Sequence, residues 1–299
     1  MNWISALVPG ILLGGYYALL ASGLSFLFGV MRIINLAHGS LAVLAAYALW
    51  VMADRYEINP FVGVLILLPV MALLGWVLHR LIFERSIKGG ALVPILSTFG
   101  LAMLTDNLLF QNFGADTRSL APYVDSLAYD SWELPGNIFV GQLAVMVFVV
   151  ALAVLGGLHL MLARTNLGRR IRAAAQDSDA AQLVGIDARG TYAIASAIAL
   201  MTVALAGLSL ALRATFDPYA GPLQLIFAFE AVVIGGAGSL WGTLIGGVIL
   251  GVAQSIGAHL HPQGFLIAGH LVFLVILVAR LYVLDRLAAV FRRLRGENQ

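Results

Sequence analysis

Long apolar segments, each close to the length of a membrane-spanning helix, occupy most of this 299-residue sequence. A helix needs roughly 20 consecutive apolar residues to cross the hydrocarbon core of a bilayer. Nine segments come near that length: 6–30, 37–53, 61–83, 91–110, 138–162, 190–212, 221–238, 241–258 and 265–283. We therefore predict an all-α fold, a polytopic transmembrane helix bundle with eight or nine hydrophobic segments.

Two of these segments are weaker predictions than the others. Segment 37–53 is short, and segment 221–238 contains Glu230 and ends in glycines. Each can be a half-helix or a re-entrant segment instead of a complete crossing. The first segment begins almost at Met1 with no basic residues before it, so we expect a retained membrane helix and not a cleaved signal peptide.

The scarcity of charge excludes several classes of protein. Charged residues make up 11% of the chain, against roughly 25% in an ordinary soluble domain. That is too little to cover a soluble enzyme of this size, and too little for a nucleic-acid-binding or disordered chain. The chain also has no cysteine, which excludes disulfides and thiolate metal ligands.

The distribution of Lys and Arg predicts the orientation in the membrane, because cytoplasmic loops carry an excess of both. With nine crossings and the C-terminus inside, 14 of the 17 basic residues fall on the inner side. Only Arg55, Arg118 and Arg213 fall outside. We predict an outer N-terminus, an inner C-terminus and an outer loop at 111–137.

No soluble domain is expected beside the membrane helices. The longest polar stretches, 111–137 outside and 163–189 inside, are too short to bury a core of their own. Residues 1–299 are therefore predicted to form a single transmembrane domain with an inner loop at 163–189.

Motifs for catalysis or cofactor binding are missing from the sequence. The only lysine, Lys88, precedes glycine, so there is no phosphate-binding loop of the G-x-x-x-x-G-K-[ST] type. No paired histidine spacing suits a metal ion, and no base accompanies Ser239 in its glycine-rich bend. We therefore predict no catalytic residue, no metal site and no cofactor.

Two interruptions of the apolar pattern carry polar residues. Asn35, His38 and Ser40 follow the first segment, and Gly235–Ser239 follows Glu230. Polar groups at membrane depth are costly unless they are paired or line a wet cavity. They can form a capping turn and a hydrogen bond within the bundle. They can also flank a translocation path, for which the candidates are Asn35, His38, Ser40, Glu230 and Ser239.

Small residues recur at helical spacing in two further places. One ladder comprises Gly10, Gly14, Ala18 and Ser22, and another comprises Gly238, Gly242 and Gly246, with Gly247 and Gly251 on a neighbouring face. Such ladders let helix backbones approach closely in lipid. They serve packing within this chain or contact with a second membrane subunit, and the sequence leaves both open.

The inner loop predicts a short helix after a basic cluster. Asp177 or Ser178 can cap it, and Gly185 can end it. This helix would present Ala180, Ala181, Leu183 and Val184 beside charged ends, which suggests a docking element. The alternative is a solvated cytoplasmic loop.

Three stretches together resemble a known family. They are GILLGGYYALLASGLSFLFGVMRIINLAHGSLAVLAAY (10–47), GRRIRAAAQDSDAAQLVGID (168–187) and FAFEAVVIGGAGSLWGTLIGGVILG (227–251). They resemble the permease subunits of branched-chain amino acid ABC importers, and are most similar to the H-type Liv permeases. Glu230 departs from the apolar or small residue that these permeases often carry there.

The resemblance implies partners and a location. It implies a second, homologous permease subunit, two cytoplasmic ABC ATPases, a periplasmic solute-binding protein and a bacterial inner membrane whose lipid surrounds the bundle, with no nucleic acid. ATP hydrolysis would reside in the partner ATPases, so this chain is not expected to be an enzyme.

The resemblance also implies that 169–187 docks on an ATPase. Asp179-Ala180-Ala181 followed by Gly185 is similar to the E-A-A-x-x-x-G signature of importer permeases, with Asp for Glu and without its Leu-Pro ending. The implied docking residues are Arg169, Arg170, Arg172, Asp179, Ala180, Ala181 and Gly185.

Several solutes and classes stay open. A branched-chain amino acid is the expected solute, and other members of the family carry other amino acids, urea, short amides or aromatic acids. The alternatives are a ribose-type sugar ABC permease, a stand-alone secondary transporter or channel, and a membrane-embedded enzyme.

Overall fold

A computed structural model of the protein describes residues 3–87, 89–90, 92–134 and 138–294. Lys88 and Arg295, which entered the predicted charge distribution, lie outside these residues. The side chains of Arg286, Arg292 and Arg293 are likewise outside the described part of the chain.

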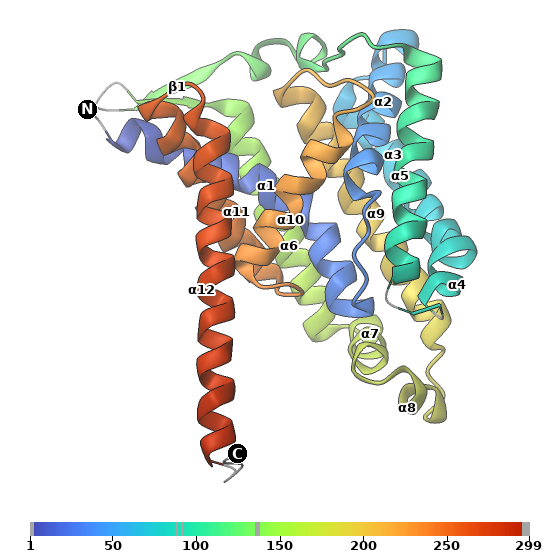
Figure 1. Cartoon of the computed structure of the whole chain (residues 1–299). Coiled ribbons are helices and arrows are strands. Elements are labelled where there is room, and N and C mark those ends of the chain that lie inside the picture. Colours follow the sequence, from blue (N-terminus) through green and yellow to red (C-terminus); the bar gives the residue numbers. More distant parts are fainter. Residues whose placement is uncertain (1–2, 88, 91, 135–137, 295–299) are drawn as a thin grey trace.

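The described chain is largely helical (Figure 1). Its α-helices are α1 (Trp3–Met31), α2 (His38–Tyr56), α3 (Pro60–Leu78), α4 (Glu84–Ile87), α5 (Leu92–Phe113), α6 (Gln142–Arg164), α7 (Asn166–Gln176), α8 (Ser178–Leu183), α9 (Ala188–Arg213), α10 (Gly221–Gly235), α11 (Leu240–Leu260) and α12 (Gly264–Leu294). A π-helical turn, η1 (His79–Phe83), joins α3 to α4, and two 3₁₀ turns, η2 (Ala121–Tyr123) and η3 (Asp125–Ala128), precede an antiparallel pair of short strands, β1 (Ser131–Leu134) and β2 (Ile138–Gly141).

The helices support a multi-pass membrane protein, as predicted. Among the described residues, six helices are long and apolar enough to span a bilayer: Ser5–Met31, Pro60–Ile87, Leu92–Phe113, Gln142–Arg164, Ala188–Arg213 and Leu240–Leu260. Two shorter apolar helices, Gly221–Gly235 and Gly264–Arg280, accompany them. The two weakly predicted segments correspond to α2 and α10, and neither of these is among the six.

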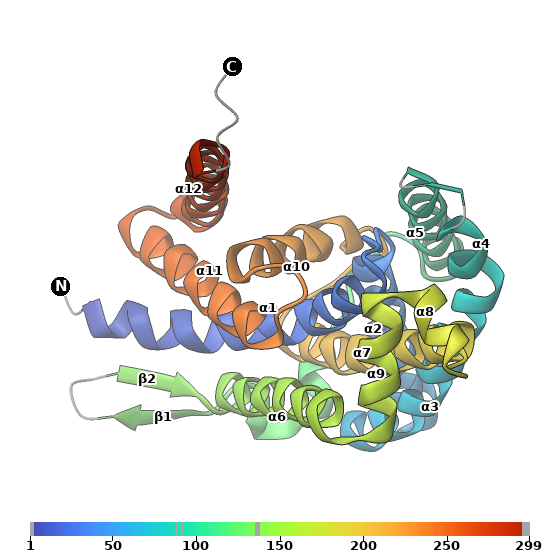
Figure 2. The ribbon, with the colours of Figure 1, turned by 90° about the horizontal axis from the view of Figure 1, so that it is seen from below.

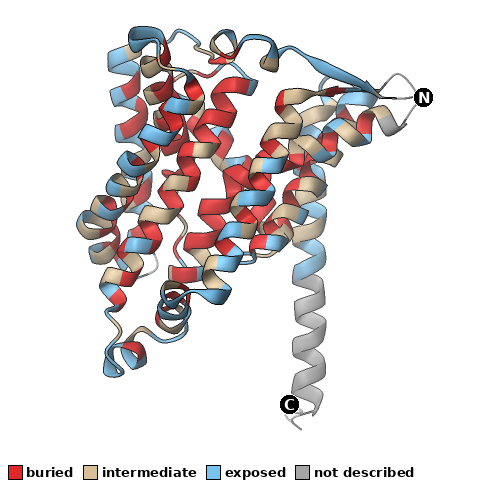
Figure 3. Cartoon of the chain, turned by 180° about the vertical axis from the view of Figure 1, so that it is seen from behind, coloured by how far each residue is buried: buried red, intermediate tan, exposed pale blue. Residues whose placement is uncertain are grey.

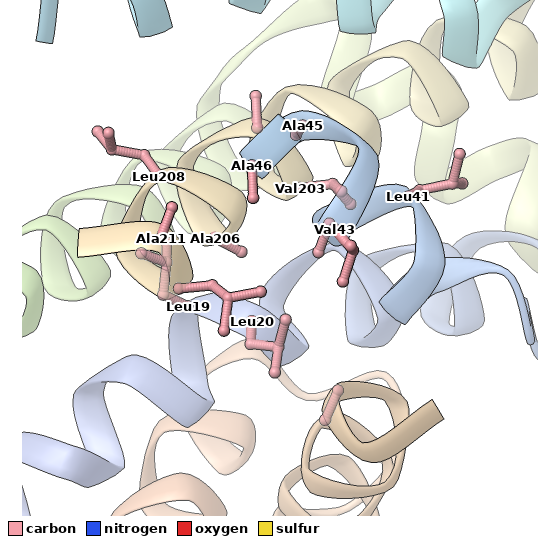
Figure 4. Packing of buried hydrophobic residues seen from close by; sticks show 14 of the residues in the cluster. Leu19, Leu20, Leu41, Val43, Ala45, Ala46, Val203, Ala206, Leu208 and Ala211 are labelled. Atoms are coloured by element: carbon pink, nitrogen blue, oxygen red, sulfur yellow. The ribbon is translucent and has the colours of Figure 1, made fainter. Parts of the chain in front are cut away.

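Helix α2 is less apolar than a lipid-facing helix because protein surrounds it. Its residues Leu41, Val43, Ala45 and Ala46 are buried against α9 and α1 (Figure 4). Small side chains let it sit deep in the bundle, and Gly207 of α9 lies so close that an added Cβ atom would be 2.5 Å from the carbonyl oxygen of Ala42.

Burial differs between the central and the outer helices of the bundle (Figure 3). In the most apolar windows of α1 and α9, 78% and 72% of the residues are buried, against 28% in α5 and 22% in α6. The exposed side chains of the outer helices are themselves apolar, as with Leu65, Leu104 and Val149. A bilayer would cover such a surface.

The glycine ladders pack against one another within this chain. A Cβ atom added to Gly14 would lie 2.4 Å from the Cα atom of Val248, and one added to Gly247 would lie 2.6 Å from the carbonyl oxygen of Gly14. In the same way, a Cβ atom on Gly246 would lie 2.1 Å from the carbonyl oxygen of Ala231. The ladders therefore join α1, α11 and α10 into a tightly packed layer.

The loop segments 114–134 and 138–141 lie at one end of the bundle, opposite to α7 and α8 (Figure 1). Arg118 and Phe216 exchange backbone hydrogen bonds of 2.8 and 2.9 Å, and the Arg118 guanidinium lies over the ring of Trp50. The Tyr123 hydroxyl donates to Asp54 Oδ1 at 2.8 Å. This hydrogen bond to Asp54 raises the pKa of the Tyr123 phenol, so the phenol keeps its proton and the bond at neutral pH.

Replacing Gly14 by valine should break the contact between α1 and α11. The added atoms meet backbone and not flexible side chains, and such overpacking typically costs about 1–3 kcal/mol of the free energy of unfolding. The thermal unfolding midpoint of the detergent-solubilised protein should fall accordingly. Gly156→Val is the matched control, because nothing lies within 4 Å of a Cβ atom added at Gly156 in α6. Equal midpoints for the two variants would contradict the packing argument.

Candidate functional site

The two interruptions predicted from the sequence lie at the same end of the bundle. α1 ends at Met31 and α10 ends at Gly235, and a Cβ atom added to Gly29 would lie 3.2 Å from the Cα atom of Gly238. Gly236 and Gly238 have φ of +96° and +86°, which only glycine adopts at low cost. Arg280 Nη2 donates to the carbonyl oxygen of Ile234 at 2.8 Å and so satisfies one free carbonyl at the end of α10.

Residues 32–37 form a non-helical connection between α1 and α2, and side chains satisfy part of its backbone. The Thr98 hydroxyl of α5 accepts from the Leu36 amide at 3.1 Å, and Asn35 Oδ1 accepts from the Ala37 amide at 3.1 Å. Irregular backbone at membrane depth is tolerated only where protein or a water-filled cavity satisfies it. The sequence left two roles open for Asn35, one in a turn and one in a translocation path. The hydrogen bond to the Ala37 amide shows that Asn35 stabilises the turn.

A buried polar cluster marks the start of α2. Asn35, His38 and Ser40 are almost completely inaccessible, and His38 Nε2 lies 2.6 Å from the carbonyl oxygen of Leu20. The Ser40 side chain lies close to the carboxylate of Asp106 in α5. Among the described residues, Asn35 Nδ2, His38 Nδ1 and Asp106 Oδ1 have no hydrogen-bond partner.

Glu230 is held by a histidine that the sequence analysis did not single out. Glu230 Oε1 lies 2.5 Å from His270 Nδ1 of α12, and Glu230 Oε2 has no partner in the described part of the chain. The hydrogen bond within the bundle, one of the two roles considered for Glu230, is thus present. The available signal for His270 was its position as the one ionisable residue in the apolar run 265–279.

Three adjoining pockets, which share Ile34, border the 32–37 connection. Their volumes are about 360, 330 and 180 Å³. The first is lined by Met31, Arg32, Ile33, Ile34, Ile87, Gly90, Pro94 and Ile95. The second, which we call the apolar pocket, is lined by Ile34, Leu36, Ile95, Leu225, Ile226, Phe229, Glu230 and Phe273. Figure 2 shows the face to which these residues belong, with α5 and α12 on either side of α10.

Ser239 lies apart from the buried candidates. Its side chain is exposed, and its hydroxyl accepts from the Gly242 amide at 3.1 Å as the N-cap of α11. Asn35, His38, Ser40 and Glu230 are buried, so the structure separates Ser239 from the other four candidates.

The inner loop forms two helices. α7 is fixed to the bundle by Tyr192, whose hydroxyl donates to the carbonyl oxygen of Ala174 at 2.6 Å, and by buried Ile171. The side chains of Arg169, Arg170 and Arg172 are exposed.

The short helix α8 confirms the predicted cap and stop. Asp177 Oδ1 accepts from the amides of Asp179 and Ala180 at 3.0 Å, and Gly185 has φ of +84° just after the helix. Leu183 and Val184 are 90% and 77% exposed. The prediction of an exposed side chain was wrong for Ala181, which is buried because α8 packs against α7 and α9.

Comparisons with known proteins give a consistent family. Residues 6–281 match the family described as branched-chain amino acid transport system / permease component. BraD of Pseudomonas aeruginosa, a high-affinity branched-chain amino acid transport system permease protein, is 27% identical over 296 residues, which cover 95% of this chain and 96% of BraD. The probable branched-chain amino acid transport permease protein LivH of Methanocaldococcus jannaschii is 31% identical over 275 residues, or 89% of this chain and 85% of LivH.

A more distant relative carries another solute. The fructose import permease protein FrcC of Rhizobium meliloti is 28% identical over 261 residues, which cover 82% of this chain and 69% of FrcC. No solved structure matches the chain. Because the family match extends over nearly all of the sequence, this protein belongs to the permease components of branched-chain amino acid transport systems.

Proposed function

We propose that this chain lines the path of a branched-chain amino acid through an ABC importer, driven by partner ATPases. The observation that carries the proposal is the irregular connection at 32–37 beside the apolar pocket. Irregular backbone exposes peptide groups to a passing solute, and the apolar wall suits an aliphatic side chain. Asn35, His38, Ser40 and Glu230 would lie on or behind this path, and Ser239 would lie at its inner end.

The lining of the apolar pocket favours an amino acid over a sugar. Seven of its eight lining residues are apolar or aromatic, and Glu230 is the exception. A sugar carries several hydroxyl groups, each of which loses hydrogen bonds with water unless the site supplies polar partners. The fructose permease relative therefore points to a shared architecture more than to a shared solute.

The partners we propose are a second homologous permease, two cytoplasmic ATPases and a periplasmic solute-binding protein. The docking element is the inner loop 163–189. α8 leads directly into α9, where Arg189 Nε lies 3.5 Å from Glu84 Oε1 at the inner end of α3–α4. Closure of the ATPases would push on α8 and shift the equilibrium between inward- and outward-facing states, with no covalent chemistry in this chain.

We further propose that residues 1–299 form one domain in a bacterial inner membrane, with nine crossings. α2 and α10 would complete the count together with α12 and the six long helices. The N-terminus and the 111–137 loop would be outside, and the C-terminus and the 163–189 loop inside. The 14 to 3 division of basic residues supports this orientation.

Co-purification and uptake test the function as a whole. The tagged chain, extracted from membranes, should bring with it two ATPases and a second permease, and the cells should accumulate radiolabelled leucine when this chain is present. Uptake by the purified chain alone without ATP, or accumulation of a sugar in place of leucine, would contradict the proposal.

Single cysteines test the sidedness and the path, and the native chain has no cysteine to interfere. Thr117→Cys should react with an impermeant thiol reagent from outside, and Gln176→Cys only from inside. Cysteines at Asn35, His38, Glu230 and Ser239 should react from at least one side during turnover, because a path is wet. Ser239 is exposed, so the three buried positions decide: if Asn35→Cys, His38→Cys and Glu230→Cys all resist labelling, the path hypothesis is wrong.

Charge reversal tests the docking element. Arg170→Glu together with Arg172→Glu should lower leucine uptake by at least about tenfold, because interfacial charge pairs typically contribute about 2–5 kcal/mol when one partner is lost. The amount of inserted protein should not change, since both side chains are exposed. Arg55→Glu on the opposite end is the matched control. Deletion of 177–185 should uncouple transport as well, and full uptake by these variants would overturn the docking role.

A further inference from the structure

The apolar pocket contains one ionisable side chain, and that side chain has an unused oxygen. Glu230 is the only charged member among its eight lining residues, and its side chain is 3% exposed. His270 takes up Oε1, and Oε2 is buried without a hydrogen-bond partner among the described residues. An acceptor left unsatisfied in this way is costly at membrane depth, so it points to a donor that is present only part of the time.

No lysine or arginine in the described part of the chain forms an ion pair with this carboxylate. Of the ion pairs in the described part of the chain, the one that involves Glu230 is with His270. The groups that face Glu230 from the neighbouring helices are His270 of α12 and the phenol of Tyr17 in α1. The Tyr17 hydroxyl is already donated to Gln254 Oε1 of α11.

His270 is placed to fix the orientation of the carboxylate. Its ring stacks on Phe227, with ring centroids 6.5 Å apart and an interplanar angle of 15°. Its Nδ1 atom is 2.5 Å from Oε1, so His270 holds one oxygen, and Oε2 is left buried and without a partner among the described residues. Two helices, α10 and α12, thus hold the buried carboxylate of Glu230 beside an apolar pocket.

From this geometry we propose that Glu230 Oε2 binds the ammonium group of an α-amino acid whose aliphatic side chain packs in the apolar pocket. The inference rests on the proposed function and names the chemical class of its solute: a primary ammonium joined to an aliphatic group. The ammonium supplies the donors and the positive charge that Oε2 lacks. Leu225, Ile226, Phe229 and Phe273 provide the apolar wall.

The pocket is of the right size for a small solute. Its volume of about 330 Å³ lies at the lower end of the roughly 300–1,000 Å³ range of ligand pockets. Urea and sugars carry no cation and would leave the carboxylate unpaired. His270, in contrast, acts as a positioning residue, because it contacts the carboxylate and not the ammonium.

The test separates the two charged ends of leucine. The probes are leucine, 3-methylbutylamine, which lacks the carboxylate, and 4-methylpentanoate, which lacks the ammonium. Each is added to the solubilised complex of permeases and ATPases without its solute-binding protein, and the shift of the unfolding midpoint is measured, since a bound ligand stabilises the folded state. Leucine and the amine should raise the midpoint of the wild type, and 4-methylpentanoate should not.

Glu230→Gln keeps the size of the side chain and removes its charge. The concentration of leucine or of the amine that gives a set midpoint shift should rise at least about tenfold, which corresponds to about 1.4 kcal/mol of binding free energy. Glu230→Asp should retain part of the response, and Glu133→Gln, the same change on the exposed hairpin, should retain all of it. His270→Ala should weaken the response less than Glu230→Gln does, because the carboxylate remains.

The outcomes that would overturn the inference are distinct from those that affect the proposed function. An unchanged response of Glu230→Gln, or stabilisation of the wild type by 4-methylpentanoate and not by the amine, would overturn the ammonium site. If the Glu230→Gln complex does not assemble, the inference is decided by the midpoint shifts that 3-methylbutylamine and 4-methylpentanoate cause in the wild type. Leucine uptake by the wild-type complex tests the proposed function separately. If the wild type takes up leucine and the midpoint response of Glu230→Gln equals that of the wild type, only the ammonium site is rejected. If the wild type does not take up leucine, the proposed transport of leucine is rejected.

Discussion

Peptide groups that leave a helix at membrane depth must find partners in the protein, and residues 32–37 find side-chain partners in α5 and in the connection itself. Thr98 of α5 binds the Leu36 amide, and Asn35 binds the Ala37 amide. Leu20 of α1 accepts from His38 at the start of α2. The connection is thus held by α5 and by its own side chains, with α1 bonded to the start of α2 beside it, and three pockets border it.

Close packing makes this arrangement stable. Apolar side chains give little drive for helix association in lipid, so backbone proximity has to provide the contact energy. Gly14 meets Val248, and Gly246 meets Ala231, at distances that exclude a side chain at either glycine. Where the chain buries most of α2, small residues such as Ala42, Ala45 and Ala46 occupy much of the helix.

Much of the fold could be predicted from the sequence, because apolar length and turn chemistry are local properties. Each of the nine apolar segments overlaps a helix, although 138–141 form strand β2 and α10 ends at Gly235, and Asp177 caps α8 as its spacing indicated. Segment 37–53 was a weak prediction because it is short, and its burial as α2 depends on neighbours distant in the sequence.

The candidate site was less predictable for the same reason. Glu230 and Asn35 were evident as polar residues in apolar surroundings. His270, 40 residues after Glu230, and Asp106, beside Ser40, become partners only when the helices assemble. Ser239 was grouped with the path from its glycine-rich context, yet its hydroxyl caps α11. A single sequence shows which residues are unusual for their surroundings, but not which of them meet.

The glycine contacts of α1, α11 and α10 have a mechanical consequence for the groove, by which we mean the three adjoining pockets that border residues 32–37. Backbones that touch cannot slide or tilt against each other without a clash, so these three helices form one stiff body. α5, on the other side of the pockets, buries only Pro94, Thr98, Thr105, Asp106 and Leu109 among its 22 residues. The groove thus has one rigid wall and one lightly held wall, and a change in its width is accommodated most cheaply by movement of α5.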